Sequence, residues 1–216
     1  MSTLLLRFAG PMQAWGADTR FDVCRTNREP TKSGVVGLLA AALGLRRDAP
    51  LDELSALHFG VRVDREGTLL RDFHTVQVHG KESEPPYITS RYYLCDAVFL
   101  VGVSSSDEGL MQRLDTAVRH PAFPLFLGRR ACPPEGRVCL GLRQEPLEGA
   151  LTHEPSLVAQ PSECVRMVLD DPDGEAQLRD VPVSFSPYRR TYGYRAAREV
   201  RLDTSRSEHD PMKELR

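Results

Sequence analysis

The residues at positions 30–34 carry groups that could bind an anion. They read Pro-Thr-Lys-Ser-Gly and lead directly into an apolar run over residues 35–43. At the start of a helix, free backbone N–H groups and the positive end of the dipole attract phosphate or sulfate, and a lysine adds charge. A capped helix with a solvated lysine would carry the same residues. The segment by itself therefore leaves an anion site and a plain helix cap equally open.

A loop that holds the only tryptophan of the chain follows the first apolar segment. It reads Gly-Pro-Met-Gln-Ala-Trp-Gly over residues 10–16. Trp15 could stack on a base and Gln13 could read a base edge, because RNA recognition favours such groups on irregular backbone. The alternative is that Trp15 closes the core under the loop, and burial statistics favour this alternative.

Residues 70–76 alternate in the manner of a strand, with Arg71 on one face and His74 on the other. His74 could act as a general acid or base. However, a lone histidine is more often a hydrogen-bonded structural residue than a catalyst.

Two further segments combine arginine with turn-forming or aromatic residues. Arg129 and Arg130 follow a glycine and precede a proline-limited turn. Such a pair suits bidentate phosphate binding, or equally an acidic residue of another subunit. Residues 187–195 interleave tyrosine with arginine, which is typical of single-strand nucleic-acid binders and also common in exposed strands.

The composition is that of an ordinary globular protein without an overall basic charge. The 216 residues suffice for one large domain or two small ones, and the formal net charge is −2. Basic stretches nevertheless precede residue 33 and follow residue 188. Local basic stripes on a neutral chain suit one nucleic-acid face and other faces that meet protein, although solvated surface is nearly as good an explanation.

Several classes of protein are not indicated by the sequence. No apolar run approaches the roughly 20 residues of a membrane span, and the N-terminus lacks the basic region of a signal peptide, so we expect a cytoplasmic protein with no membrane contact. The five cysteines are scattered, which favours free thiols in a reducing compartment. Neither a Walker loop nor a histidine metal pair is present, and we expect no cofactor and no metal.

The predicted elements follow the order strand, helix, strand, inserted arm, strand, helix, strand. This is the order of a ferredoxin-like α+β fold with an excursion between its second and third strands. Ser106 is the expected cap of the second long helix. The strands, helices and arm are predicted at 3–9, 31–44, 51–57 (a short helix), 58–64, 69–78, 79–86 (the arm), 92–103, 107–119 and 137–142, with further strands at 163–169 and 181–185.

Taken together, these motifs resemble the CasD family, subunits of the type I-E CRISPR interference complex called Cascade. The resemblance spans residues 4–133 at family spacing and is weak beyond about residue 140. It rests on Gly10-Pro11-Met12-Gln13-x-Trp15-Gly16, Pro30-Thr31-Lys32-Ser33-Gly34-x-x-Gly37-Leu38-Leu39-Ala40-Ala41-x-Leu43-Gly44, Arg71-Asp72-Phe73-His74-Thr75-Val76, Tyr93-Leu94-Cys95-Asp96-Ala97 and Leu127-Gly128-Arg129-Arg130-x-Cys132-Pro133.

The resemblance implies an RNA-binding subunit of the RAMP superfamily without catalytic activity. Such a subunit holds the 5′ handle of the CRISPR RNA (crRNA), contacts the large subunit CasA and the backbone subunit CasC, and meets target DNA only through the assembled complex. A ferredoxin-like, RRM-like domain would cover residues 1–142 with a β-hairpin thumb at about 77–91, and a small β-rich region would cover 143–216. The expected RNA-binding residues are Met12, Gln13, Trp15, Arg25, Thr31, Lys32, Ser33, Gly34, Arg71, His74, Arg91, Arg129 and Arg130.

A second function of a different class is a metal-independent endoribonuclease, because CasD-like relatives in type I-C systems cleave precursor RNA. His74 would then act with Lys32 or with a tyrosine such as Tyr92 in acid–base catalysis of 2′-OH attack. The sequence offers only one plausible catalytic histidine and no matched pair, which favours the binding function.

Overall fold

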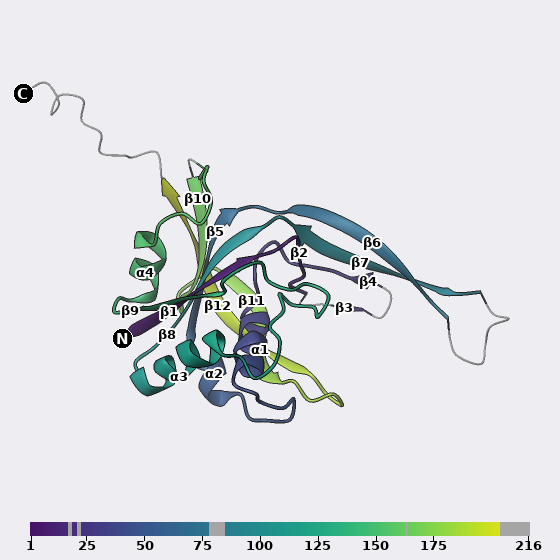
Figure 1. The fold of residues 1–216 in the computed structure, drawn as a ribbon, viewed down its shortest axis with the longest axis horizontal. Coiled ribbons are helices and arrows are strands. Elements are labelled where there is room, and N and C mark those ends of the chain that lie inside the picture. The colour runs from purple at the N-terminus through teal and green to yellow at the C-terminus, as the bar shows by residue number, and fades with distance from the viewer. Residues whose placement is uncertain (17–18, 21–22, 78–84, 163, 204–216) are drawn as a thin grey trace, which may run out of the picture.

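The computed structural model describes residues 1–16, 19–20, 23–77, 85–162 and 164–203, and shows a mixed α+β body from which a two-stranded arm projects (Figure 1). The body is built on a seven-stranded antiparallel sheet in the order β11-β12-β10-β5-β8-β1-β9. Its strands are β1 (Ser2–Ala9), β5 (His58–Arg65), β8 (Val98–Ser105), β9 (Cys139–Arg143), β10 (Cys164–Asp170), β11 (Ala176–Ser184) and β12 (Thr191–Asp203).

Helices cover both faces of this sheet, and that explains why consecutive residues of β1 are buried. On β1, Leu4 and Leu6 belong to the core formed with the first three helices, whereas Leu5 belongs to the core formed with the fourth. Successive residues of a strand point to opposite faces, so both sets of side chains are buried. The helices are α1 (Lys32–Ala42), α2 (Asp52–Ser55), α3 (Glu108–Arg119) and α4 (Leu147–His153).

The helix ends confirm most of the predicted local signals. The Thr31 hydroxyl accepts a hydrogen bond from the Gly34 N–H at 3.2 Å, and Gly44 has φ +75° just past the end of α1. The prediction of Ser106 as the cap of α3 is wrong by one residue, because the Asp107 carboxylate accepts from the Leu110 N–H at 2.9 Å. Helix α4 was not predicted: it is short, and its first turn has no side-chain cap.

The arm consists of β6 (Thr68–Val76) and β7 (Tyr87–Cys95), paired from Thr68 opposite Cys95 to Val76 opposite Tyr87. At its root, β7 also pairs with β2 (Met12–Gln13) and β4 (Val23–Cys24), and β4 pairs with β3 (Thr19–Arg20). Residues 78–84 lie outside the described residues, and they include most of the predicted arm at 79–86 and part of the predicted thumb at 77–91.

The strand predicted at 92–103 is in fact two strands in different sheets. The chain breaks at Asp96, which adopts φ +58°, and this left-handed conformation turns β7 of the arm into β8 of the body. An aspartate tolerates that conformation better than most residues. The apolar residues on either side of Asp96 nevertheless predict one continuous strand.

The last three strands extend the same sheet. Strand β10 pairs with β5, and β12 then pairs with β10 and β11. The sheet therefore continues across residue 142, where the sequence places a domain boundary. No helix among the described residues is long and apolar enough to cross a bilayer.

Candidate nucleic-acid interface

The first turn of α1 holds an anion, and that anion is a carboxylate of the same chain. The Lys32 N–H donates to Asp180 Oδ2 at 2.8 Å, and the Lys32 ammonium pairs with Asp170 at 2.9 Å. Lys32 is only 6% exposed. The expectation of an open phosphate site at this helix start therefore has to be corrected: the helix dipole attracts a negative group, but Asp180 occupies the position.

Arg195 completes a buried cluster of four charges with these residues. Its guanidinium donates to Asp180 at 2.7 and 3.1 Å and to Asp170 at 2.7 Å. Burial by itself lowers the pKa of Arg195, but the hydrogen bonds and charges of the two aspartates outweigh it and hold the pKa above its ordinary value. The cluster joins α1 to β10, β11 and β12, so its first role is to fix the C-terminal strands against the helix.

Trp15 closes the core, as the alternative interpretation of its loop predicted. It is 1% exposed and stacks on Phe8 with ring centroids 5.4 Å apart. The indole N–H donates to Gln13 Oε1 at 3.1 Å, and the Gln13 amide donates to the Ala97 carbonyl at 2.8 Å. Both side chains are buried and satisfied, while Met12 before them is half-buried. In this conformation neither Trp15 nor Gln13 presents a surface to a base.

The loop around Trp15 also anchors two neighbouring segments. The Trp15 backbone N–H donates to the Thr26 hydroxyl at 2.8 Å, and the Trp15 carbonyl accepts from the Asn27 N–H at 2.9 Å. On the other side the Ala14 N–H donates to the Leu127 carbonyl at 3.1 Å. Gly128 passes so close that an added Cβ would lie 1.7 Å from the Ala14 oxygen. This packing brings the arginine turn after Gly128 to the root of the arm.

Arg129 and Arg91 both lie at that root, on the face of β7 that carries Tyr93. The Arg129 guanidinium lies over the Tyr93 ring at 4.8 Å and donates to the Cys24 carbonyl at 3.0 Å. Arg91 precedes Tyr93 by two residues and so shares its face. Within the described residues, Arg129 Nη1 and Arg91 Nε are buried and have no hydrogen-bond partner. Buried donors without partners are rare, and here both belong to cations.

The opposite face of the arm carries Arg71. Its guanidinium lies 6.0 Å from the Tyr92 ring and donates to the Ser90 hydroxyl at 3.1 Å. His74 lies on the Arg91 side of the arm, where its Nε2 is 2.8 Å from Asp72 Oδ2. The predicted RNA-binding residues therefore divide between two faces of the arm and the buried interior.

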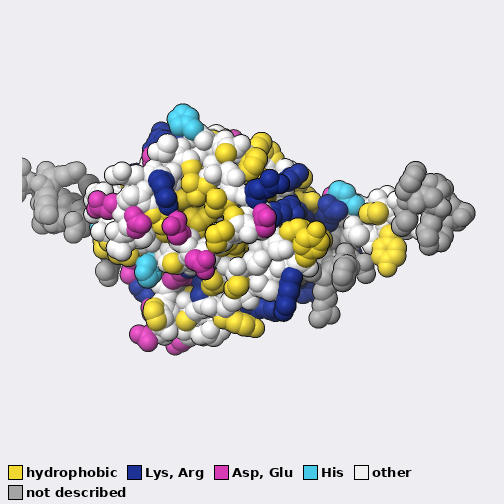
Figure 2. Space-filling view, turned by 90° about the horizontal axis from the view of Figure 1, so that it is seen from below, with side chains coloured by type: hydrophobic (Ala, Val, Ile, Leu, Met, Phe, Trp, Pro, Cys, Tyr) yellow, Lys and Arg dark blue, Asp and Glu magenta, His cyan; other side chains and the backbone are white. Residues whose placement is uncertain are grey.

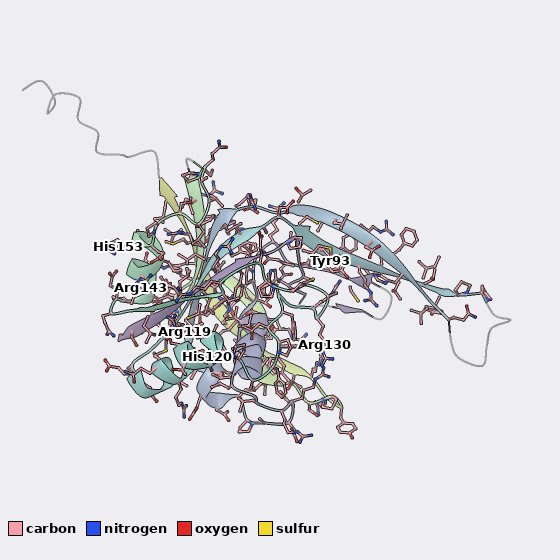
Figure 3. All side chains as sticks on the ribbon, viewed as in Figure 1. Tyr93, Arg119, His120, Arg130, Arg143 and His153 are labelled. Carbon is pink, nitrogen blue, oxygen red and sulfur yellow. The ribbon has the colours of Figure 1, made fainter. Side chains whose placement is uncertain are left out.

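Exposed cations gather at the end of the body from which the arm projects. Arg25 and Arg130 are both exposed, and Arg130 lies on the loop below Tyr93 (Figure 3). Figure 2 shows Lys and Arg side chains concentrated toward this end and most Asp and Glu side chains toward the other. This segregation makes the arm end the natural side for an anionic partner.

The groups invoked for RNA cleavage are not assembled in one place. Lys32 is buried against Asp170, whereas His74 and Tyr92 point to opposite faces of the arm. No cluster of three or more metal-ligating side chains occurs among the residues described.

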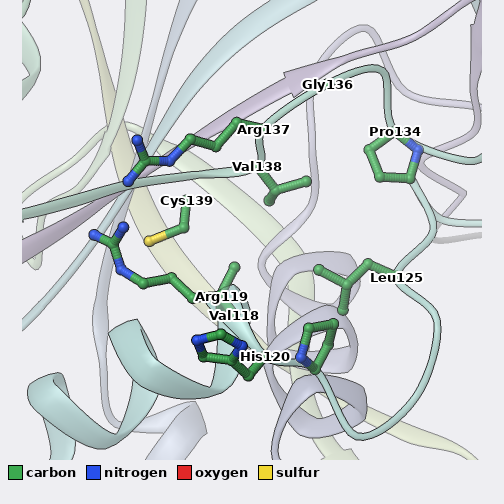
Figure 4. A pocket seen from close by; sticks show the side chains of 10 residues that line it. Val118, Arg119, His120, Leu125, Pro134, Gly136, Arg137, Val138 and Cys139 are labelled. Atoms are coloured by element: carbon green, nitrogen blue, oxygen red, sulfur yellow. The ribbon is translucent and has the colours of Figure 1, made fainter.

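A separate cavity of about 560 Å³ lies between the end of α3 and the segment 134–139 (Figure 4). Arg119, His120 and Arg137 line it. The Arg119 guanidinium donates two hydrogen bonds to the Asp115 carboxylate, at 2.8 and 2.9 Å, so its charge is neutralised within the protein. None of the residues expected to bind RNA lines this cavity.

Sequence reasoning misses the residues that decide which cations are free. Asp180 and Asp170 reach Lys32 from 148 and 138 residues away. Tyr93, which lies against Arg129, belongs to one of the family motifs but is not among the residues expected to bind RNA. Alternation along that strand could have placed Arg91 and Tyr93 on one face.

Comparison with known proteins is consistent with this architecture. The model of the family described as CRISPR-associated protein (Cas_Cas5) matches residues 3–198. The chain is 40% identical over 174 residues to the CRISPR system Cascade subunit CasD of Escherichia coli (strain K12), covering 71% of this chain and 78% of that protein.

Two solved structures are similar over almost the whole chain. One, described as a crystal structure of a Cas protein, gives a TM-score of 0.78 at 41% identity and covers 94% of this chain and 96% of its own. The other, described as a CRISPR RNA-guided surveillance complex, gives 0.79 at 33% identity and covers 93% of this chain and 90% of its own.

Proposed function

Because this chain belongs to the Cas5 family of CRISPR-associated proteins, we propose that it is the type I-E Cascade subunit that binds and caps the 5′ handle of the crRNA. The observation that supports this most directly is made at the arm root, the part of the arm where β7 pairs with β2 and β4. There two guanidinium groups, those of Arg91 and Arg129, lie on the side of Tyr93 and have buried nitrogens without a hydrogen-bond partner in the part of the chain that the structure describes.

An RNA backbone supplies what these groups lack. Phosphate oxygens accept strong, charge-assisted hydrogen bonds from guanidinium, and a planar fork matches them in two places. Within the described residues, neither Arg91 nor Arg129 is paired with a carboxylate. Arg25 and Arg130 add charge nearby, and Arg71 and His74 extend along the arm. The proposed contact surface therefore consists of exposed or half-exposed groups on the arm and on the arginine turn.

The buried candidates act indirectly in this proposal. Gln13 and Trp15 hold the loop that positions the arginine turn, and the residues from Thr31 to Gly34 hold the start of α1. Met12 lies half-buried beside them, at the root of the arm. Their contribution to RNA binding is to keep the arm root rigid, which lowers the entropic cost of binding.

We assign the frame β1-α1-β5-β8-α3-β9 to the ferredoxin-like arrangement of the RAMP superfamily. Its strands lie in the order β5-β8-β1-β9 and are all antiparallel, as that arrangement requires. The arm β6–β7 is inserted between the second and third strands of the frame and corresponds to the thumb. CasA and CasC are the proposed protein partners, and target DNA is reached through the assembled complex.

The proposal is tested by the affinity of the full chain for single-stranded RNA of its own CRISPR repeat. Arg129→Ala should weaken binding roughly 10- to 100-fold, the loss of one or two charge-assisted hydrogen bonds. It should also reduce the slope of log affinity against log salt by about 0.7, since one phosphate contact is lost. Fluorescence anisotropy at several salt concentrations measures both.

A matched control separates this effect from a general loss of charge. Arg113 pairs with Glu53 at the exposed surface, and Arg113→Ala should leave affinity nearly unchanged. Arg129→Lys keeps the charge but loses the planar fork over Tyr93, so it should retain the salt slope and lose affinity. Unchanged binding in Arg129→Ala would rule out the arm root as the RNA site.

A further inference from the structure

The turn between β11 and β12 carries aromatic and basic side chains that no contact within the described residues explains. Tyr188 is 97% exposed, and Arg189 and Arg190 beside it are exposed as well. Residues 181–194 contain no aspartate or glutamate. Tyr188 directly precedes the two arginines, and Val183 and Tyr194 of the same hairpin are exposed as well. Exposed apolar side chains gathered in one place mark an interaction site.

The outer face of the same hairpin continues this chemistry. Tyr192 and Tyr194 alternate with Gly193 and Arg195, so the two tyrosines lie on the face opposite the buried charge cluster. Tyr194 is 68% exposed, and the Arg179 guanidinium lies 6.0 Å from its ring. Arginine and tyrosine thus recur as neighbours from the strands to the tip.

The base of the hairpin is fixed rigidly to the body. Arg195 is locked onto Asp180 and Asp170, and the Ser55 hydroxyl of α2 donates to the Pro182 carbonyl at 2.7 Å. Phe185 lies against Gly37 of α1, where an added Cβ would be 3.7 Å from the ring. The tip is therefore a preorganised surface, because the strands that carry it cannot swing away from α1.

The hairpin also lies toward the basic end of the molecule. Its tip and the arm project to the same side of the body in Figure 1, and Figure 2 shows basic side chains there on both sides of exposed hydrophobic ones. Aromatic rings for base stacking together with arginines for the backbone are the combination that single-stranded nucleic acid requires. An acidic protein would pair with the arginines but would leave the tyrosines without a stacking partner.

We propose that the β11–β12 tip is a second contact for the crRNA, in which Tyr188 stacks on an unpaired base and Arg189 and Arg190 neutralise the adjoining phosphates. This site deepens the proposed function and rests on it. The arm root and the tip would then bind two separate stretches of one RNA strand.

The test compares variants of the full chain in binding single-stranded repeat RNA. Tyr188→Ala should lower affinity roughly 5- to 100-fold, and Tyr188→Phe should bind as the natural chain does, because stacking needs the ring and not the hydroxyl. The double variant Arg189→Ala/Arg190→Ala should reduce the slope of log affinity against log salt by about 1.4. Ultraviolet crosslinking with mass spectrometry should place RNA on the peptide that contains Tyr188.

The control is Arg113→Ala/Arg201→Ala, which removes the same charge from exposed residues elsewhere. If this control lowers affinity and the salt slope as much as the tip variant does, the effect is one of net charge and the proposal is wrong. If tip variants bind RNA normally while Arg129→Ala does not, the proposal fails and the proposed function stands. If they bind RNA normally but no longer assemble with other Cascade subunits, the tip is a protein contact and the proposal fails. Absence of RNA binding by the natural chain would overturn both.

Discussion

At the scale of single residues, environment rather than residue type decides which arginines can meet a ligand. Arg195 and Arg129 are both largely withdrawn from water, but Arg195 is paired with two carboxylates. Arg129 lies over a ring, donates to one carbonyl, and has one buried nitrogen without a hydrogen-bond partner among the described residues. A cation over an aromatic ring keeps its full charge, whereas a carboxylate cancels it. Arg129 therefore remains available to phosphate, and Arg195 does not.

Cys139 provides a prediction at this scale. Burial and a hydrogen bond to Asp115 raise the pKa of the Cys139 thiol to about 11. Only the thiolate is nucleophilic, so at pH 8 iodoacetamide should modify the exposed Cys164 well before Cys139. Mass spectrometry of the labelled peptides over time gives the two rates, and equal rates would contradict the geometry around Cys139.

The same raised pKa predicts the sign of a pH dependence. The unfolded chain ionises this thiol near its ordinary pKa, while the folded chain keeps it protonated up to about pH 11. Stability contributed by the protonated thiol is present at lower pH and falls as pH rises from about 9 towards 11. Urea titrations should show a smaller fall across this window in Cys139→Ala than in the natural chain.

At the scale of elements, the buried charge cluster is the main link between α1 and the C-terminal strands. Breaking a buried pair leaves an uncompensated charge, which costs more than the pair itself contributes. Asp180→Ala would remove the acceptor of the Lys32 N–H and two of the three hydrogen bonds that Arg195 donates to carboxylates. We expect it to lower the free energy of unfolding by about 3–5 kcal/mol.

Denaturant unfolding measures this effect, and Glu175→Ala is the control. Glu175 is an exposed carboxylate just before the same strand, so its removal should change stability by less than about 0.5 kcal/mol. A loss in Asp180→Ala no larger than in Glu175→Ala would mean that the cluster does not hold the strands to the helix.

The elements themselves were largely predictable because their signals are local. Thr31 and Gly44 marked both ends of α1, and the arm strand at 69–78 followed from simple alternation. The failures were also local in cause. Asp96 interrupts an apolar run without a glycine or proline, and α4 begins without a capping side chain, so neither produced a pattern.

At the scale of the whole molecule, the arrangement favours binding over cleavage. The groups considered for catalysis, His74, Tyr92 and Lys32, lie on two faces of the arm and in the interior. A general base must be within hydrogen-bond reach of the proton that it removes, and no such set is assembled among them.

We expect the full chain to leave its repeat RNA intact when the two are incubated in EDTA. Denaturing gel electrophoresis of end-labelled RNA is the measurement, with His74→Ala assayed in parallel. Site-specific cutting that disappears in His74→Ala would show that the protein is a nuclease after all.

The sequence by itself determined most of the elements and their order, both ends of α1, and the family to which the motifs point. These properties depend on neighbours a few residues apart, which a linear pattern records. Only the tertiary structure decided which predicted groups face a ligand. The anion at the start of α1 proved to be Asp180, 148 residues away, and Trp15 proved to be core. The charge available to an anionic partner is what remains after such long-range pairs have formed, and no local pattern encodes that remainder.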